Sequence, residues 1–535
     1  NTEATLLGYW GTGTTVYTGA DRYNIKNLMM GQYKAEVKGK NWFLRGYTIQ
    51  ENAGDSYTAT TAALYINNSW KSNANWFQEY AGAYGAARLG LLPGMPTMLT
   101  AEQAHAIARA QAETGRYEPG SAGFKEAFDK AVNTSINDGG ARFDDETDMY
   151  HFEGQYNFNE KVKVVDITVG ASYRLYHLNS HGTIFADTAG AINLSEIGGY
   201  VQLQKSLLND ALKLTGSFRY DKHENFDGRI TPRGTAVIRV APNNNIRLSY
   251  QTAYRFPTNQ DQYINLLTGG ANRLIGGLRE FEKFFGFDVN PAYTAESVVA
   301  YRNSFATNPN GDPSLLRTAQ FKEIKPERVN SYEIGYRGLV VPKLLVDAYG
   351  YYSIYKDFIG RTAVGRGQST DPDEAKEQLA SPFTTNNYSF VVNTDNNVKA
   401  IGWGIGLNYE FGRGFQASVN VSSDKLNDVP DTVVTFFNTP EFRFNVGLAN
   451  VNIWKGIGFN IMYRWQDEVL WEGTFGTGPI PSFGVLDAQI SYNLPRIKGI
   501  IKLGAANVMN DYYRSAFGNP LVGGLYYASF GYNVK

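Results

Sequence analysis

The side chains that could perform metal or acid–base chemistry are few and scattered. Four of them form an acidic run, Asp144, Asp145, Glu146 and Asp148, and carboxylate oxygens are the ligands that Ca²⁺ and Mg²⁺ prefer. The run lacks the regular spacing and the glycine of a calcium loop, so a solvated loop is favoured over a cation site at Asp144, Asp145 and Asp148. His177 and His181 would share a face only on a helix, whereas the pattern around them is that of a strand, which argues against zinc.

The sequence contains no arrangement typical of an enzyme. The motifs G-x-S-x-G, H-E-x-x-H and G-x-x-x-x-G-K-[ST] are all missing, and each would place a nucleophile, a metal or a phosphate in a defined geometry. With no cysteine in the chain, disulfides and thiolate metal sites are excluded. We therefore predict that the protein is not an enzyme and holds no cofactor.

The long segment 256–325 mixes aromatic rings with amide and charged side chains. Such a mixture suits a glycan or a peptide, through ring stacking combined with polar contacts. Phe284 and Phe285 are the candidate stacking rings. An ordinary polar loop would explain the same composition. The candidate ligand-binding residues of this region are Arg255, Asn259, Gln260, Tyr263 and Arg273.

A second set of charged residues alternates with apolar ones along extended segments. Its members are Arg219, Arg239, Arg247, Arg255, Glu333 and Arg337. These side chains could contact a second domain or steer an anionic ligand. The alternative is that they pair with one another along a solvated wall.

The segments that carry these charges have the period of two residues that defines a β-strand with one apolar and one polar face. Leu212, Leu214, Phe218 and Tyr220 alternate with Lys213, Thr215, Ser217 and Arg219, and the alternation returns from Ile246 to Arg255. A soluble sandwich and a membrane barrel both show this pattern, with opposite faces exposed. The strands run about ten residues or more, which is the length that a tilted membrane strand needs. Length therefore favours a barrel.

Composition agrees with a large membrane barrel. The 535 residues contain 36 Tyr and 31 Phe, and aromatic rings gather where a barrel meets the membrane interfaces. There is no linker that would divide the chain and no apolar run of the length that a transmembrane helix requires. The net charge of −1 announces no surface for polyanions, so nucleic acid is not an expected partner.

The first third of the chain does not show a regular alternation of strands and turns. We predict strands at Leu28–Val37, Trp42–Gln50 and Thr60–Trp70, after a segment 1–27 that gives only weak strand signals. A long insertion, 71–148, follows. Thr100 and Gln103 have the spacing of a capping box before a helix over 101–113, and a second helix is predicted over 124–132. An insertion with its own helices must lie outside the membrane, and we expect it on the extracellular side.

After Met149, tight turns and long connections alternate. The turns fall at 209–210, 242–244, 342–343, 412–414 and 455–456, and the long connections at 256–325, 357–397, 423–439, 467–481 and 509–523. Short turns on one rim and long loops on the other are typical of an outer-membrane barrel, and we count roughly eighteen strands. Tracing back from a periplasmic C-terminus places the short turn at 38–41 on the extracellular side.

Three stretches resemble the barrel of TonB-dependent outer-membrane receptors. These are GRITPRGTAVIRVAPNNNIRLSYQTAYRFPT (228–258), IKPERVNSYEIGYRG (324–338), and LDAQISYNLP with IKLGAANVMNDYYRSAFGNP and GLYYASFGYNVK at the C-terminal end. WFLRGYTIQENAGDSY and NWFQEYAGAY resemble the large receptors of Bacteroidetes, the group that includes SusC-like transporters. The resemblance covers 42–535.

The resemblance implies an all-β fold, a large antiparallel transmembrane barrel of about 22 strands around a globular plug. It implies import of a scarce nutrient (a glycan, a peptide or a chelate) across the outer membrane, driven by the TonB–ExbB–ExbD complex acting on the plug. The lumen-facing charges Arg219, Arg239, Arg247, Glu333 and Arg337 would then contact the plug. The expected surroundings are the lipid bilayer and lipopolysaccharide, and a surface lipoprotein is a possible partner.

Two features depart from the family pattern. Residues 1–535 read as barrel throughout, with neither a plug nor a TonB box, and the strand count is about four short of 22. We expect the chain to be the barrel portion of a longer receptor, and the alternative is a barrel that has lost its plug. The functional alternatives are a passive pore and a structural barrel that anchors a larger surface complex, with the insertion 71–148 as a docking element.

Overall fold

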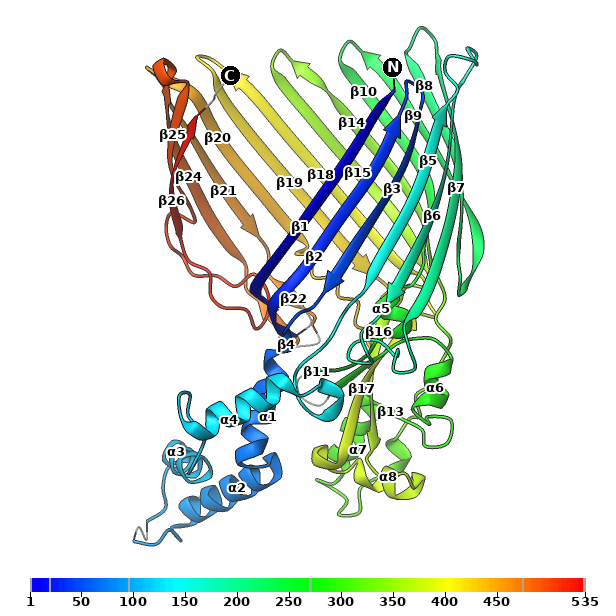
Figure 1. Cartoon of the computed structure of the whole chain (residues 1–535). Coiled ribbons are helices and arrows are strands. Elements are labelled where there is room, and N and C mark those ends of the chain that lie inside the picture. Colours follow the sequence, from blue (N-terminus) through cyan, green and yellow to red (C-terminus); the bar gives the residue numbers. More distant parts are fainter. Residues whose placement is uncertain (1, 19–20, 95–96, 269–271, 474–475, 533–535) are drawn as a thin grey trace.

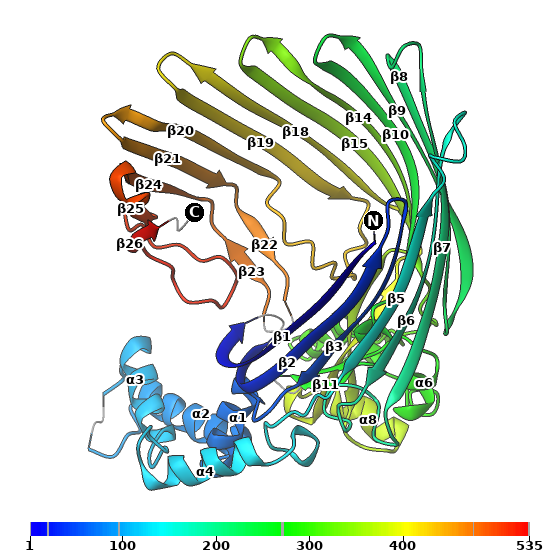
Figure 2. The same ribbon diagram turned by 45° about the horizontal axis from the view of Figure 1, so that its top comes forward.

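The computed structural model describes residues 2–18, 21–94, 97–268, 272–473 and 476–532. Its dominant feature is one antiparallel sheet of nineteen strands that curves round a lumen (Figure 1). The two-residue strand β4 (Tyr57–Thr58) pairs with the start of β2, and its Tyr57 also forms an isolated bridge with Arg142. The other strands follow one another as a meander. In the described part of the chain the two edge strands, β1 and β26, do not pair with each other, and they lie apart in Figure 2.

The strands of the meander are mostly long enough to cross a membrane with the tilt that Figure 1 shows. They are β1 (Glu3–Thr18), β2 (Arg22–Lys38), β3 (Trp42–Asn52), β5 (Asp148–Asn157), β6 (Asp166–Leu178), β7 (Ile192–Leu207), β8 (Leu212–His223), β9 (Phe226–Ala241), β10 (Asn244–Arg255), β14 (Glu327–Val341), β15 (Leu344–Lys356), β18 (Val398–Phe411), β19 (Phe415–Asn427), β20 (Phe442–Trp454), β21 (Ile457–Gln466), β24 (Phe483–Leu494), β25 (Gly499–Ala506) and β26 (Leu525–Tyr532).

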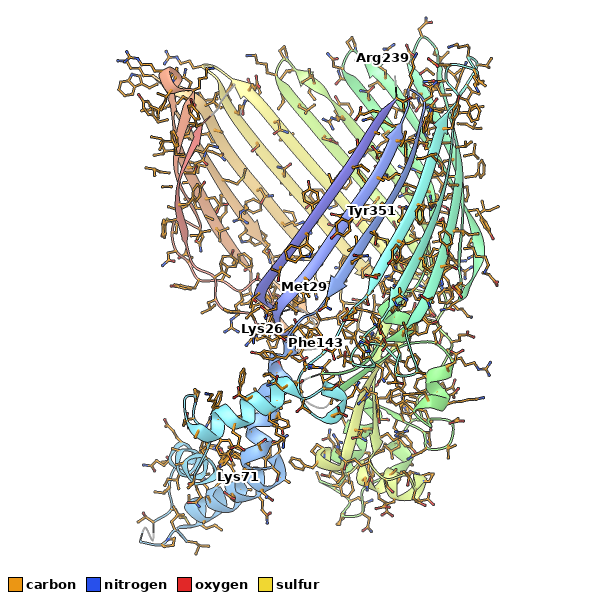
Figure 3. The ribbon with its side chains drawn as sticks, in the orientation of Figure 1. Lys26, Met29, Lys71, Phe143, Arg239 and Tyr351 are labelled. Atoms are coloured by element: carbon orange, nitrogen blue, oxygen red, sulfur yellow. The ribbon has the colours of Figure 1, made fainter. Side chains whose placement is uncertain are left out.

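The two faces of the sheet differ as the alternation predicts. Ile401, Trp403 and Ile405 of β18 are exposed on the outer face, as an apolar face that meets lipid must be. The inner face carries charged and hydroxyl groups. Tyr351 of β15, labelled in Figure 3, donates its hydroxyl hydrogen to Asp424 Oδ1 of β19 at 2.6 Å. Among described residues, no helix combines the length and the apolar character that a membrane-spanning helix needs.

Short turns occupy one rim of the barrel, which we call the short-turn rim, and long connections occupy the other, the long-loop rim (Figure 1). The predicted turns at 209–210, 242–244, 342–343, 412–414 and 455–456 all lie on the short-turn rim and are confirmed. Several close through residues with positive φ, among them Asn209, Asn243 and Gly456. Asparagine and glycine adopt this conformation at low cost, which allows a turn of two or three residues.

Two strand assignments differ from the prediction. Segment 3–18 forms a full strand, β1, although its Gly- and Thr-rich sequence gives a weak signal. Segment 60–70, predicted as a strand, belongs to helix α1 (Ala59–Trp70), in which Ala62 and Ile66, one turn apart, are buried. The predicted strand 60–70 would have crossed the barrel once, whereas α1 does not cross it. Every strand before α1 therefore runs in the direction opposite to the predicted one. The turn at 38–41 therefore lies on the short-turn rim, and its predicted place on the opposite rim is wrong.

The long connection between β3 and β5 forms a helical arm, residues 59–141, which projects from the long-loop rim (Figure 1). Its helices are α1, α2 (Asn73–Leu89), α3 (Ala101–Ala112) and α4 (Ala122–Asn133). The capping box of Thr100 and Gln103 at the start of α3 is confirmed. Helices α1 and α2 were not predicted. The arm packs through small side chains, and Ala87, Ala104, Ala108 and Ala112 are fully buried, so α2 and α3 approach closely.

Lys71 holds the centre of the helical arm together (Figure 3). Its Nζ donates to Glu79 Oε2 at 2.6 Å and to the carbonyl oxygen of Ala112 at 2.8 Å, and it lies 4.8 Å from the ring centroid of Trp70. One ammonium group thus links α1, α2 and the end of α3. Because it satisfies an orphan carbonyl at a helix end, its loss should be felt in all three helices.

We expect Lys71→Ala to lower the stability of the helical arm by about 2 kcal/mol, through the loss of two charge-assisted hydrogen bonds. Hydrogen exchange of amides in α2 and α3 should accelerate, while exchange in the barrel strands stays unchanged. Lys125→Ala, on the exposed side of α4, is the matched control and should change nothing. Equal exchange rates in the two variants would contradict the role given to Lys71.

A second body on the long-loop rim, the loop lobe, is built from residues 256–326 and 357–397. Its five-stranded sheet has the order β11 (Asn265–Thr268), β12 (Asn272–Ile275), β17 (Thr385–Asn393), β16 (Ile359–Gly367), β13 (Tyr293–Thr294). Its helices are α5 (Asn259–Tyr263), α6 (Glu280–Phe284), α7 (Ala295–Ser304) and α8 (Pro372–Gln378). A second small sheet, β22 (Val469–Trp471) with β23 (Gly478–Ile480), belongs to a later loop.

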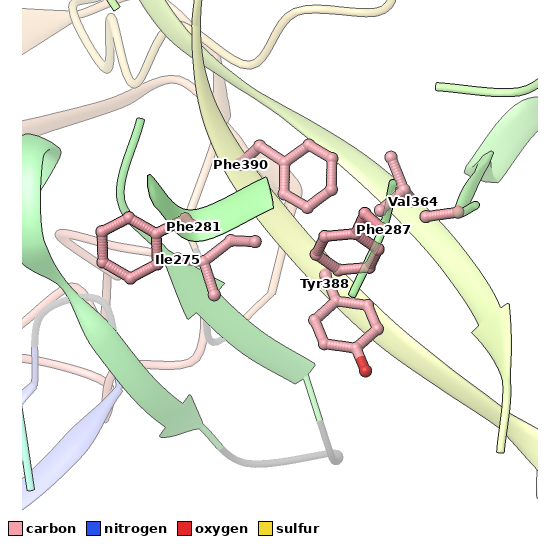
Figure 4. Packing of buried hydrophobic residues seen from close by; sticks show 7 residues of the cluster. Ile275, Phe281, Phe287, Val364, Tyr388 and Phe390 are labelled. Carbon is pink, nitrogen blue, oxygen red and sulfur yellow. The ribbon is translucent and has the colours of Figure 1, made fainter. Parts of the chain in front are cut away.

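The loop lobe has a hydrophobic core of its own (Figure 4). Ile275, Phe281, Phe287, Val364, Tyr388 and Phe390 are buried against one another. Strands β12 and β17 pair in parallel, which joins two loops that are more than a hundred residues apart in sequence. The lobe touches the helical arm at the Phe77–Phe383 ring pair, with centroids 5.7 Å apart. Two long loops therefore act as one folded unit above the barrel.

Candidate ligand-binding site

The charged residues of the inner barrel wall form ion pairs with their neighbours. Arg219 Nε lies 2.7 Å from Asp221 Oδ2, Arg247 Nε lies 2.9 Å from Glu333 Oε1, and Arg337 Nη1 lies 3.3 Å from Asp347 Oδ2. Arg239, at the short-turn rim, donates to the carbonyl oxygen of Asn209 at 2.7 Å. This arrangement fits a mutually paired wall. Contacts of Arg219, Arg239, Arg247, Glu333 and Arg337 with a plug stay a prediction.

A cavity of about 650 Å³ lies where the long-loop rim closes over the barrel, and we call it the mouth cavity. Its volume is within the range of ligand sites. One side is formed by Tyr17, Tyr23 and Glu51 at the ends of β1, β2 and β3, together with Phe143 and Asp145 from the segment that returns from the helical arm. The other side is formed by Arg255, Gln260, Asp261, Phe358, Arg361 and Phe436.

Arg361 supplies a buried positive charge to the mouth cavity. It lies on β16 of the loop lobe and only 8% of it is exposed. Nη1 donates to the carbonyl oxygen of Ser389 at 3.2 Å, and Nε and Nη2 donate to no other described residue. Burial lowers the pKa of this guanidinium, and the nearby Asp261 carboxylate partly opposes that effect. Since a guanidinium has five donor hydrogens, most of the hydrogen-bonding capacity of Arg361 is unused.

The other charged groups on that side already have hydrogen-bond partners. Arg255 Nη2 donates to Glu327 Oε2 at 2.9 Å, and Glu327 also accepts from the backbone nitrogen of Ile359 at 2.9 Å. Asp261 Oδ2 completes the capping box of α5 by accepting from the backbone nitrogen of Thr258 at 3.1 Å, and it also accepts from the Thr258 hydroxyl at 2.8 Å. Glu327 thereby fastens the loop lobe to the barrel wall beside Arg361. Among the described residues, Arg361 is the basic group of this side that forms no ion pair with a carboxylate.

Two carboxylates that form no ion pair with a basic side chain of the described residues line the mouth cavity on the opposite side. Glu51 lies near the end of β3 with its side chain on the inner face of the barrel, and it interacts electrostatically with Asp145. Burial raises the pKa of Asp145, although the Thr147 hydroxyl that donates to its Oδ1 opposes the shift, and the acidic Asp187 and Glu146 add to it. A cation placed between Glu51 and Asp145 would relieve their repulsion.

Three aromatic residues of the mouth cavity adjoin one another on the same side as the carboxylates, and we call them the aromatic wall. Tyr17 and Tyr23 stack with centroids 6.2 Å apart, and Phe143 meets Tyr23 edge to face at 5.8 Å. Figure 3 shows Phe143 where the helical arm joins the barrel. The site therefore combines an apolar wall, an acidic side and a basic side.

The residues predicted to bind ligand divide into two groups. Arg255 and Gln260 line the mouth cavity. Tyr263 instead accepts a hydrogen bond from Asn225 Nδ2 at 2.8 Å, and Arg273 Nη1 donates to Asn265 Oδ1 at 2.7 Å. Burial raises the pKa of Tyr263 and lowers that of Arg273. Asn259 begins α5 outside the cavity lining. Arg273 thus bonds within the loop lobe, and Tyr263 joins the lobe to the turn between β8 and β9.

The aromatic rings of segment 256–325 are largely structural. Phe285 packs against the core of the loop lobe and meets Tyr388 edge to face, with centroids 5.9 Å apart. Phe284 is the exposed exception. The ring-rich composition that suggested ligand stacking is explained mainly by the lobe core, since loops that fold independently need apolar side chains of their own.

The acidic run does not come together as a cation site. Asp144 forms an ion pair with Arg142 at 3.1 Å, Asp145 faces the mouth cavity, and Asp148 begins β5, where it accepts from the Tyr150 hydroxyl at 3.3 Å. Within the described ranges, no three His, Cys, Asp or Glu side chains are grouped as metal ligands. His177 lies on strand β6, as the pattern predicts, and its Nδ1 is 2.8 Å from Asn193 Oδ1.

Comparison with known families agrees with this architecture. Residues 2–510 match the family model described as TonB dependent receptor-like, beta-barrel. This chain belongs to the TonB-dependent receptor family. Its members are outer-membrane receptors and transporters of Gram-negative bacteria, not enzymes. The resemblance to the barrel family that the motifs indicated is thereby confirmed, and this receptor barrel is an outer-membrane protein.

Solved structures show the same fold at low sequence identity. The siderophore receptor PirA from Acinetobacter baumannii is 11% identical with a TM-score of 0.55, covering 94% of this chain and 62% of that one. The ferric enterobactin receptor PfeA from Pseudomonas aeruginosa is 12% identical with a TM-score of 0.57, covering 96% and 63%. The FrpB iron transporter from Neisseria meningitidis is 12% identical with a TM-score of 0.54, covering 99% and 69%.

The receptor barrel spans somewhat under two thirds of the length of the first of these structures. No sequence among the curated proteins matches it. The likeness to solved structures therefore supports the fold alone.

Sequence reasoning missed several residues of the mouth cavity. Glu51 could have been found, since it continues the inward-facing row of Arg45, Tyr47 and Ile49 in β3. Arg361 could not, because it lies on a loop strand whose place above the barrel depends on the pairing of β16 with β17.

Proposed function

We propose that this receptor barrel is the transport part of an active outer-membrane importer that captures a nutrient at the mouth cavity. The long-loop rim would face the outside of the cell, because the loop lobe and the helical arm are both built there. The single observation that carries the proposal is the mouth cavity itself, a concave site with an apolar wall and unpaired charges of both signs above the lumen. Such a site is suited to bind a small solute before transport.

Related proteins support import as the general activity. The similar structures include a siderophore receptor, an iron transporter and a copper transporter. For this chain we infer the same mode of action, in which the TonB–ExbB–ExbD complex pulls on a plug domain inside the barrel. The paired inner wall, with Arg219, Arg247 and Glu333, would present fixed dipoles to that plug.

We also propose a Bacteroidetes-type assembly with a surface lipoprotein. The support is the sequence likeness at 42–57 and 75–84, and α2 of the helical arm contains the second of these stretches. Phe77 of α2 is exposed beside the loop lobe. A lipoprotein that covers the mouth cavity would contact both bodies. Stable co-purification with a lipoprotein would support this assembly, and isolation of the receptor alone from native membranes would contradict it.

Energised uptake is the test that separates an importer from a passive pore. Cells carrying the full-length protein should accumulate nutrient at a rate that falls at least tenfold when a protonophore collapses the inner-membrane gradient, because the TonB complex depends on that gradient. A pore would admit solute at the same rate with and without the protonophore. Cells lacking the protein give the background, and uptake that ignores the protonophore would refute the importer.

A further inference from the structure

Among the described lining residues, one side of the mouth cavity carries acidic charges alone, whereas the other carries Arg255 and Arg361 together with the Asp261 carboxylate. Glu51 and Asp145 lie on the side formed by the barrel strands and the return from the helical arm, and Arg361 lies on the side formed by the loop lobe. Neither carboxylate forms an ion pair with a basic side chain of the described residues. Arg361 has one protein acceptor for five donor hydrogens. The cavity therefore has an acidic pole and a basic pole.

The apolar lining runs along the acidic side and continues across the cavity. Tyr17, Tyr23 and Phe143 form the aromatic wall, and Phe358 and Phe436 face the cavity from the side of the loops. A neutral glycan would leave both poles without a counter-charge, and burying unpaired charges is costly. A polyanionic chelate would be repelled by Glu51 and Asp145. A ligand with a cationic end, an apolar body and an anionic end satisfies all three surfaces.

We propose that the mouth cavity binds short zwitterionic peptides with apolar side chains. The peptide ammonium group lies between Glu51 and Asp145, its carboxylate accepts two hydrogen bonds from Arg361, and its side chains pack against Tyr17, Tyr23 and Phe143. A planar guanidinium matches a carboxylate in this bidentate geometry. The inference deepens the proposed import function and rests on it, since it names the substrate class of the same site.

Arg361 can bind a ligand carboxylate without any rearrangement of the barrel wall. Glu327 already neutralises Arg255, so Arg255 does not compete for the ligand carboxylate. Asp261, the acid near Arg361, is held by the cap of α5. Arg361 is thus positioned by its bond to the Ser389 carbonyl and keeps donors that no other described residue accepts. Its burial makes that interaction stronger than it would be in water.

The experiment measures binding of trileucine to the purified full-length protein in detergent by isothermal titration calorimetry. N-acetylation removes the ammonium charge of the peptide, and C-terminal amidation removes its carboxylate. We expect each modification to weaken binding roughly 10- to 100-fold, the loss typical of one charge-assisted hydrogen-bonding group. Because only the ligand is changed, this comparison does not depend on whether a variant folds.

Variants then assign each charge to a residue. In Glu51→Gln/Asp145→Asn, trileucine should bind as weakly as its acetylated form, and acetylation should cause no further loss. In Arg361→Gln, amidation should cause no further loss, and Arg361→Lys should recover part of the affinity. Arg233→Gln, a variant away from the cavity lining, is the control and should bind like the unmodified protein.

Two results would overturn the proposal. One is equal binding of trileucine and of its acetylated and amidated forms. The other is tighter binding of a neutral oligosaccharide or a ferric catecholate, with no dependence on Arg361. Neither result touches the uptake test with the protonophore, because calorimetry involves no transport. Failure of the peptide assignment and failure of the import function are therefore distinguishable.

Discussion

Phe287→Ala is expected to unfold the loop lobe while leaving the barrel intact. The Phe287 ring is 5% exposed and lies 4.8 Å from the centroid of Phe321, 5.2 Å from that of Tyr388 and 5.4 Å from that of Phe390. The Arg366 guanidinium lies over its face at 4.6 Å. Removing the ring from such a core should cost about 4 kcal/mol, which is a large part of the stability of a small body.

Limited proteolysis measures the result. Cleavage within 256–326 and 357–397 should accelerate strongly, and the barrel strands should stay resistant. Because β16 carries Arg361, the variant should also lose ligand binding. Phe284→Ala removes the same ring from a position of the same lobe that is 60% exposed, and it should behave like the unmodified protein. Equal cleavage of the two variants would show that the loop lobe is not held by this core.

Gly402→Ala is expected to destabilise the barrel by about 3 kcal/mol. Gly402 lies on the inner face of β18, and a Cβ there would come within 2.5 Å of Asp424 Oδ1 and closer still to the ring of Tyr351. Tyr351 and Arg443 both bond to Asp424, at 2.6 Å each. The methyl group must displace the ring and break a hydrogen bond to a charged acceptor, so overpacking and a lost bond add together.

Urea unfolding of the purified barrel gives the measurement, as a lower midpoint for Gly402→Ala. Gly216→Ala is the matched control, since a Cβ at that strand position meets nothing within 4 Å. It should be neutral or slightly stabilising, because alanine restricts the unfolded chain. In a Tyr351→Ala background the cost of Gly402→Ala should shrink, since the ring that clashes is gone. If Gly402→Ala lowers the stability by the same amount in the Tyr351→Ala background, the clash with the Tyr351 ring is not the cause of the loss.

The barrel could be predicted closely because each strand carries its own evidence. The period of two in segments such as 212–220 and 246–255 depends only on which face meets lipid, and the tight turns depend on local residues such as Asn243 and Gly456. The errors fell where local signals were weak or misleading. Segment 3–18 is rich in Gly and Thr, and segment 60–70 contains Thr, Tyr and Ile, which favour strands, yet it packs as a helix against Ala131 and Ala141.

The candidate site, unlike the barrel, could be predicted from the sequence only in small part. Arg255 and Gln260 were within reach of sequence reasoning, since they follow an inward-facing strand into a long loop. Tyr263 and Arg273 looked equivalent to them in sequence, yet Tyr263 bonds to Asn225 of the β8–β9 turn and Arg273 bonds to Asn265 within the loop lobe, and Asn259 lies outside the cavity lining. Composition indicates that a loop has polar and aromatic groups, but it does not indicate which of them are used internally.

By itself the sequence determined the strand period, the two unequal rims, the capped helix of the insertion and the family. Only the tertiary structure decided that two loops form one lobe, that Arg361 is buried with spare donors, and that Glu51 and Asp145 face it across a cavity. The reason is physical. Alternation and turns are local properties of the chain, whereas the mouth cavity joins residues from 17 to 436 through long-range pairings such as β12 with β17, and no local pattern records which loops will meet.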